Sequence, residues 1–131
     1  PVPLTGDGTI LLIEDDPTVR GIVSTMLENQ VYAIIDTADG EAAISLFETH
    51  GASIQLVISD LTMRGLSGRQ TTDRIRTLAP EIRVLYMSGY PDHPVFDRDG
   101  VSRETGFLSK PFSPHVMAQK VREVLDGVKA A

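Results

Sequence analysis

The chain has 131 residues, 41% of them hydrophobic, and its 18 acidic and 12 basic side chains give a formal net charge of -6. This length and apolar content fit a single domain with one core, and the acidity argues against nucleic acid or an anionic membrane as a direct partner. The sequence contains no cysteine, which excludes disulfides, thiolate catalysis and zinc-thiolate sites. We also expect neither a membrane span, which needs roughly 20 apolar residues, nor a signal peptide.

The first structured part of the chain predicts a strand followed by a helix. Residues 10–13 form an unbroken apolar run, which is typical of a strand buried on both faces. Asp16 and Pro17 then supply the N-cap and the first-turn proline of a helix. The apolar positions that recur along this helix are Val19, Ile22, Val23, Met26 and Leu27.

The strand–helix unit then recurs twice. A second strand is predicted over residues 31–35, followed by a helix that Asp39 caps and Gly51 ends. A third strand over residues 56–59 is apolar until it reaches Asp60. Its glycine-bearing loop leads into a helix that begins with a capping box. The apolar stripe of the first of these helices is Ala43, Leu46 and Phe47. In the second, Ser67 and Gln70 offer the capping box, and Ile75 and Leu78 are the apolar residues.

Two more strands and a final helix complete the pattern. Strands are predicted over residues 82–87 and 106–109, and the prolines and glycine within residues 89–104 predict a short or loosely held helix between them. The last helix opens at Ser113 and Pro114, with Met117, Val121, Val124, Leu125 and Val128 facing inward. Five such alternations predict an α/β, doubly wound fold with helices on both faces of a parallel sheet.

The polar residues of this pattern collect where strands end. In open parallel sheets, ligands bind beyond the carboxyl ends of the strands, where the strand order reverses. If the order is 2-1-3-4-5, Glu14 and Asp15 after strand one meet Asp60 after strand three. Three carboxylates in one crevice repel one another, and a divalent cation removes that repulsion. Because the ligands are all hard oxygens, they favour Mg²⁺ over zinc or copper.

Two further polar residues stand at the same edge. Strand four ends in Ser88, whose hydroxyl can donate a hydrogen bond, and strand five ends in Lys110, which adds a positive charge. With Mg²⁺ bound, the formal charges of the three acids, the lysine and the metal cancel. The predicted site can therefore receive a phosphoryl group without an unscreened negative field.

Four stretches of the chain resemble the response-regulator receiver family of two-component signalling: residues 10–16, 57–63, 87–90 and 106–112. The resemblance extends from Thr9 to Val128. It implies a flavodoxin-like receiver fold built as (βα)5. We assign residues 1–8 to a linker, 9–129 to the receiver domain and 130–131 to a tail.

The resemblance also implies roles for individual residues. Asp60 would be the phosphoacceptor, Asp15 and the backbone carbonyl of Thr62 would join it as direct metal ligands, and Glu14 would act through a water. Ser88 and Phe107 would form the switch pair, and Lys110 would contact the phosphoryl group. Glu14 and Ser88 depart from the usual aspartate and threonine, and Phe107 lacks the hydroxyl of a tyrosine.

The implied function is phosphorelay signalling in the cytoplasm. A histidine kinase or histidine phosphotransfer domain would donate the phosphoryl group to a monomer or weak dimer, with at most slow self-phosphorylation and autodephosphorylation. Residues 86–90 are also similar to those of receivers in hybrid histidine kinases. A hybrid kinase fragment and a single-domain regulator both fit.

Two other classes of function share parts of this pattern. A Mg²⁺-dependent aspartyl phosphohydrolase of the haloacid dehalogenase type needs a second acid two residues after its nucleophile, where this chain has Thr62. A flavodoxin-like cofactor binder cradles phosphate in a hydroxyl-rich or glycine-rich loop. The acidic first loop, residues 14–16, would instead repel phosphate in the absence of metal.

Overall fold

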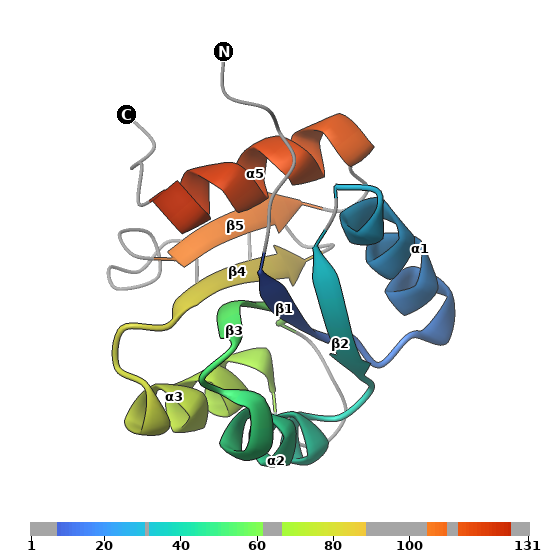
Figure 1. Cartoon of the computed structure of the whole chain (residues 1–131). Helices are drawn as coiled ribbons and strands as arrows, with labels where there is room; N and C mark the ends of the chain where they lie inside the picture. The colour runs from blue at the N-terminus through green and yellow to red at the C-terminus, as the bar shows by residue number, and fades with distance from the viewer. Residues whose placement is uncertain (1–7, 31, 62–66, 89–104, 110–112, 127–131) are drawn as a thin grey trace.

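The computed structural model describes residues 8–30, 32–61, 67–88, 105–109 and 113–126, and gives the backbone alone for residues 88, 105–109 and 126. The elements are β1 (Thr9–Ile13), α1 (Pro17–Glu28), β2 (Ala33–Thr37), α2 (Gly40–His50), β3 (Ile54–Asp60), α3 (Gly68–Leu78), β4 (Arg83–Ser88), β5 (Thr105–Ser109) and α5 (Pro114–Asp126). The strands form one parallel sheet (Figure 1), as the alternation of strands and helices predicted. Their order is β2-β1-β3-β4-β5, the order on which the predicted meeting of the acids depended. The helix expected within residues 89–104 lies outside the described part of the chain.

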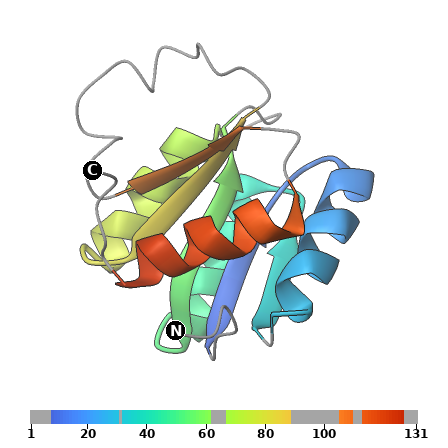
Figure 2. The ribbon, with the colours of Figure 1, turned by 90° about the horizontal axis from the view of Figure 1, so that it is seen from above.

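The helices lie in two layers around the sheet (Figures 1 and 2): α1 and α5 cover one face, and α2 and α3 cover the other. Each face has its own hydrophobic core. Along β1, Ile10 and Leu12 pack toward α1 and α5, whereas Leu11 and Ile13 pack toward α2 and α3. Because successive side chains of a strand point to opposite faces, a strand covered on both sides must be apolar throughout. The prediction from the unbroken run is confirmed.

The edge strand β2 differs from its prediction. It begins at Ala33 and ends at Thr37, two residues later than expected. Pairing with β1 sets these bounds, since Thr9 lies opposite Ala33 and Ile13 opposite Thr37. Val31 lies outside the described residues.

Three predicted helix starts are confirmed. The Asp16 carboxylate accepts hydrogen bonds from the backbone N–H groups of Thr18 and Val19, at 2.9 and 3.2 Å. Asp39 caps α2 in the same way. Ser67 and Gln70 form the reciprocal capping box of α3.

Two apolar residues of the predicted helices are exposed. Ile22 of α1 is 52% exposed and Leu78 of α3 is 50% exposed. On α3 the inner face instead includes Thr71 and Thr72, both fully buried. Their hydroxyls are satisfied, because Thr71 donates to the carbonyl of Ser67 at 2.9 Å and Thr72 shares a hydrogen bond of 2.5 Å with the Tyr86 hydroxyl. Of the inward residues predicted for the last helix, Met117, Val121 and Val124 are buried, Leu125 is partly buried and Val128 lies outside the described residues.

No helix in the described part of the chain combines the length and the apolar character needed to cross a membrane.

Candidate functional site

Three carboxyl groups meet at the carboxyl edge of the sheet. Each of Glu14, Asp15 and Asp60 contributes an oxygen atom, and these three oxygens lie within 4.8 Å of one another. Glu14 is 1% exposed and Asp60 is 6% exposed, while Asp15 is partly buried. The predicted convergence of these acids is therefore present in the structure.

The strand register explains this meeting. β1 and β3 are neighbours, and Ile13 of β1 lies opposite Ser59 of β3. The next residue along each strand is an acid, so Glu14 and Asp60 leave the sheet at the same level. The N–H of Glu14 also donates to the carbonyl of Thr37 at 3.0 Å, which extends the pairing of β1 with β2 by one residue.

The backbone of Asp60 is fixed by the start of α3. A Cβ atom at Gly68 would overlap the Asp60 carbonyl oxygen and would lie 2.9 Å from the Ser59 hydroxyl oxygen. Only glycine permits this approach without movement. The Gly68 N–H donates to the carbonyl of Leu61 at 3.1 Å, and the Leu61 N–H donates to the carbonyl of Met87 at 3.0 Å. The end of β3 is thereby held between α3 and β4.

The loop that carries Glu14 and Asp15 is fixed in a similar way from α1. The backbone N–H of Asp16 donates to Oε2 of Glu14 at 3.1 Å. Nη1 of Arg20 donates to the carbonyl oxygen of Glu14 at 2.8 Å. Arg20 was not predicted as a site residue from the sequence. The available signal was its position early in α1, because helical side chains point back toward the N-terminus of the helix, where the acids lie.

The chemistry of the site follows from its donor set. Carboxylates this close together repel one another, more strongly where burial removes water. A cation that takes oxygen ligands offsets this repulsion, and a set made only of carboxylate oxygens suits Mg²⁺ better than zinc or copper. The residues present therefore fit a magnesium ion.

The remaining predicted site residues are described only in part. Ser88 ends β4 one residue beyond Met87, which lies opposite Asp60, so its backbone reaches the same edge of the sheet. Phe107 lies in β5 opposite Tyr86. The side chains of Ser88 and Phe107, and the whole of Thr62 and Lys110, lie outside the described residues, so their roles stay predictions.

Comparisons with known proteins agree on one family. Residues 10–122 match the response regulator receiver domain. The chain is 31% identical over 123 residues to the sensor kinase CckA of Brucella abortus (strain 2308), a match that covers 94% of this chain and 13% of that kinase. This chain thus spans a small part of that relative.

Two solved structures extend the comparison. The receiver domain of the hybrid histidine kinase CckA is 30% identical, with a TM-score of 0.76 over 90% of this chain and 99% of that one. A chain of the CheX–CheY–BeF3–Mg²⁺ complex from Borrelia burgdorferi is 24% identical, with a TM-score of 0.81 over 89% of this chain and 88% of that one, and shares the fold. Because the family match covers most of the chain and its acids meet at the edge where this fold binds ligands, the chain belongs to the response regulator receiver domain family.

Proposed function

We propose that this domain is a phosphoacceptor in a two-component phosphorelay, with Asp60 as the residue that is phosphorylated. The observation that carries the proposal is the gathering of Glu14, Asp15 and Asp60 within 4.8 Å at the carboxyl edge of the sheet. Receiver domains are generally phosphoacceptors rather than enzymes, and the family match supports that reading. The donor would be a phosphohistidine of a histidine kinase or of a histidine phosphotransfer domain.

The transfer moves one phosphoryl group between two side chains. A carboxylate oxygen of Asp60 forms a bond to phosphorus as the bond from phosphorus to the histidine nitrogen breaks, and the histidine leaves with the electron pair of that bond. Glu14, Asp15, Asp60 and the carbonyl of Thr62 would hold Mg²⁺, with Glu14 acting through a water. When bound, Mg²⁺ neutralises negative charge on the phosphoryl oxygens.

Other residues would complete the site. Lys110 would pair with one phosphoryl oxygen, and the Ser88 hydroxyl would donate a hydrogen bond to another. In the receiver family, this pull on the hydroxyl turns an aromatic residue inward, and Phe107 would be that residue here. The result would be a changed surface formed by the fourth helix, expected within residues 89–104, together with β5 and α5, through which the domain signals.

The surrounding protein is part of the proposal. The similarity to the receiver of a hybrid histidine kinase favours a domain of such a sensor kinase, and a single-domain regulator is the alternative. In either case the partner would be a cytoplasmic kinase or phosphotransfer domain. The receiver itself would act as a monomer or weak dimer.

Labelling with acetyl phosphate tests this function. Incubation with MgCl₂ should add one phosphoryl group per chain, detected by mass spectrometry, and the label should be stable in acid and lost in base. Asp60→Asn should abolish it. Asp16→Asn is the matched control, because Asp16 is exposed and caps α1, a role that asparagine also performs.

Two outcomes would contradict the proposal. A label that persists in Asp60→Asn would place the acceptor elsewhere. Sustained turnover of acetyl phosphate or p-nitrophenyl phosphate would instead favour an aspartyl phosphohydrolase. Such an enzyme needs an acid two residues after its nucleophile, where this chain has Thr62.

A further inference from the structure

Arg20 connects three parts of the molecule around the acidic site. It lies on α1, and its Nη1 donates to the carbonyl oxygen of Glu14 at 2.8 Å. Its Nε lies 3.8 Å from Oδ2 of Asp36 on β2. The Glu14 N–H donates to the carbonyl of Thr37 on β2. Contacts from β2 and α1 therefore hold both the N–H and the carbonyl of Glu14.

The bond to the Glu14 carbonyl also affects the next residue. The carbonyl of Glu14 and the N–H of Asp15 belong to one planar peptide unit. Fixing the direction of that carbonyl therefore fixes the plane from which both acidic side chains depart. Glu14 and Asp15 are two of the three residues whose carboxylate oxygens meet, so a single guanidinium contacts the peptide unit that joins two of the three acids.

Arg20 could influence a bound cation in two opposite ways. As a positive charge it would repel the cation, so its removal would tighten binding. As a hydrogen-bond donor it holds the acids in place, so its removal would weaken binding. The Arg20 side chain is 23% exposed and faces the carboxylate of Asp36, which offsets its charge toward the site, and solvent screens what remains. Orientation should therefore dominate.

We propose that Arg20 is a positioning residue that holds Glu14 and Asp15 in the geometry required for cation binding. This inference rests on the proposed magnesium site and adds a residue to it. Groups that orient metal ligands through hydrogen bonds typically change metal affinity by about 10- to 100-fold when they are removed. Arg20 binds the backbone of its ligand rather than the carboxylate, so we expect an effect near the lower limit.

Calorimetric titration of the full chain with MgCl₂ tests the proposal. Arg20→Met keeps the aliphatic stem and should weaken Mg²⁺ binding by about 10-fold. Arg20→Lys keeps a charge and one donor group, and should fall between Arg20→Met and the unchanged protein. Arg83→Met is the matched control, because Arg83 is an exposed arginine at the start of β4, at the opposite edge of the sheet. It should leave the affinity unchanged.

The outcomes separate this inference from the proposed function. If the unchanged protein binds no Mg²⁺, the proposed function fails. If it binds Mg²⁺ and Arg20→Met binds equally well or more tightly, the positioning role is overturned while the site stands. Denaturant unfolding without metal checks that each variant is folded. If Arg20→Met does not fold, Arg20→Lys decides, with weaker binding in support of the role and equal binding against it.

Discussion

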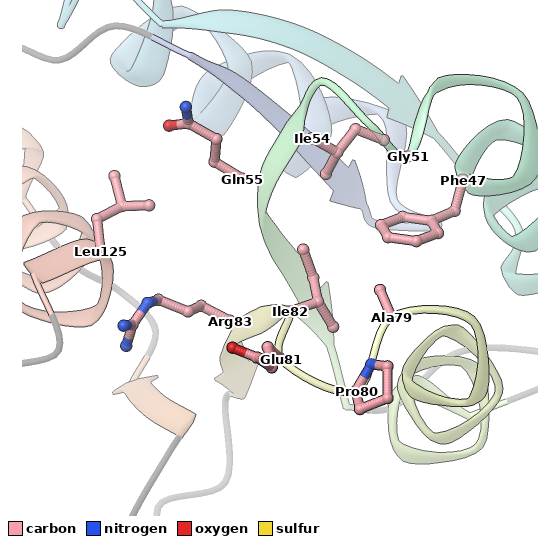
Figure 3. A pocket seen from close by; sticks show the side chains of 10 residues that line it. All are labelled: Phe47, Gly51, Ile54, Gln55, Ala79, Pro80, Glu81, Ile82, Arg83 and Leu125. Carbon is pink, nitrogen blue, oxygen red and sulfur yellow. The ribbon is translucent and has the colours of Figure 1, made fainter.

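The carboxyl edge and the amino edge of the sheet carry different kinds of side chain. At the carboxyl edge, β1 and β3 end in acids that lie within 4.8 Å of one another and are largely buried. At the amino edge, a groove of about 530 Å³ lies under the starts of β3 and β4 (Figure 3). Phe47, Ile54 and Ile82 line its apolar side. The carboxyl edge brings acidic side chains together, whereas the amino edge carries a groove with an apolar side.

The glycines at these edges show the same contrast. At the amino edge, a Cβ atom at Gly51 would lie 2.6 Å from the carbonyl oxygen of Phe47 and 3.0 Å from its ring. At the carboxyl edge, a Cβ atom at Gly68 would meet the backbone of Asp60. The first close approach serves packing and the second places a residue of the proposed phosphorylation site. Substitutions should therefore separate stability from ligand binding.

The largest expected effect is on stability, at the amino edge. Phe47→Ala should lower the free energy of unfolding by about 3–5 kcal/mol, because it removes a buried ring and leaves a cavity. Phe47 is 4% exposed and packs in the core that α2 and α3 share. Urea denaturation measures the loss. The Mg²⁺ affinity of the folded fraction should not change, and a change in it would mean that the two edges are coupled.

The strands inside the sheet, β1 and β3, could be predicted from the sequence because both of their faces are buried, whereas the edge strand β2, which is partly exposed, was misplaced by two residues. A short unbroken apolar run such as residues 10–13, ended at once by acids, favours a strand covered on both faces. The acids at the ends of β1 and β3 stood out against those runs, so Glu14, Asp15 and Asp60 could be assigned to one site. Pattern and chemistry agreed at each of these positions.

The buried residues of the helices were predicted less well, because the apolar residues cover a wider part of the helix surface than the part that is buried. Ile22 matched the helical spacing but is 52% exposed. Thr72 is fully buried, although its hydroxyl made it look like a surface residue, because it bonds to Tyr86 of another element. Arg20 also reads as a surface residue until the backbone carbonyl that it contacts is known. The contacts of Thr72 and Arg20, and the exposure of Ile22, depend on how each helix sits on the sheet, which its own sequence pattern does not fix.

A second prediction uses glycine to alanine substitutions at both edges. Gly68→Ala should cost about 1–3 kcal/mol of unfolding free energy, since overlap with a backbone atom forces movement. It should also weaken Mg²⁺ binding, because the atoms displaced belong to Asp60. Gly51→Ala should reduce stability without affecting Mg²⁺ binding. Denaturation and calorimetric titration measure the two properties on the same samples.

Gly21→Ala provides the control for helix propensity. Gly21 lies within α1, and a Cβ atom there would have no neighbour within 4 Å. Alanine should therefore stabilise the domain by about 0.5–1 kcal/mol. If Gly68→Ala were stabilising as well, the close approach of α3 to Asp60 would not constrain the site.

The last expected effect, smaller than those of Phe47→Ala and Gly68→Ala, lies between the two edges, at Tyr86 of β4. Burial raises the pKa of the Tyr86 phenol above its ordinary value near 10, although the hydrogen bond with Thr72 and the charges of Arg76 and Arg69 oppose the shift. Above pH 10 the unfolded chain therefore releases this proton before the folded domain does. The free energy of unfolding should fall as the pH rises through that range.

Tyr86→Phe should remove this part of the pH dependence. At pH 7 the variant should be less stable by about 1 kcal/mol, because the hydrogen bond with Thr72 is lost. Above pH 10 the gap between the two proteins should narrow, since the unchanged protein alone carries the cost of a buried phenol that resists ionisation. Urea denaturation from pH 7 to pH 11 measures both, and the other tyrosines cancel in the difference. Parallel curves would mean that Tyr86 ionises as readily in the folded domain as in the unfolded chain, which its complete burial against α3 argues against.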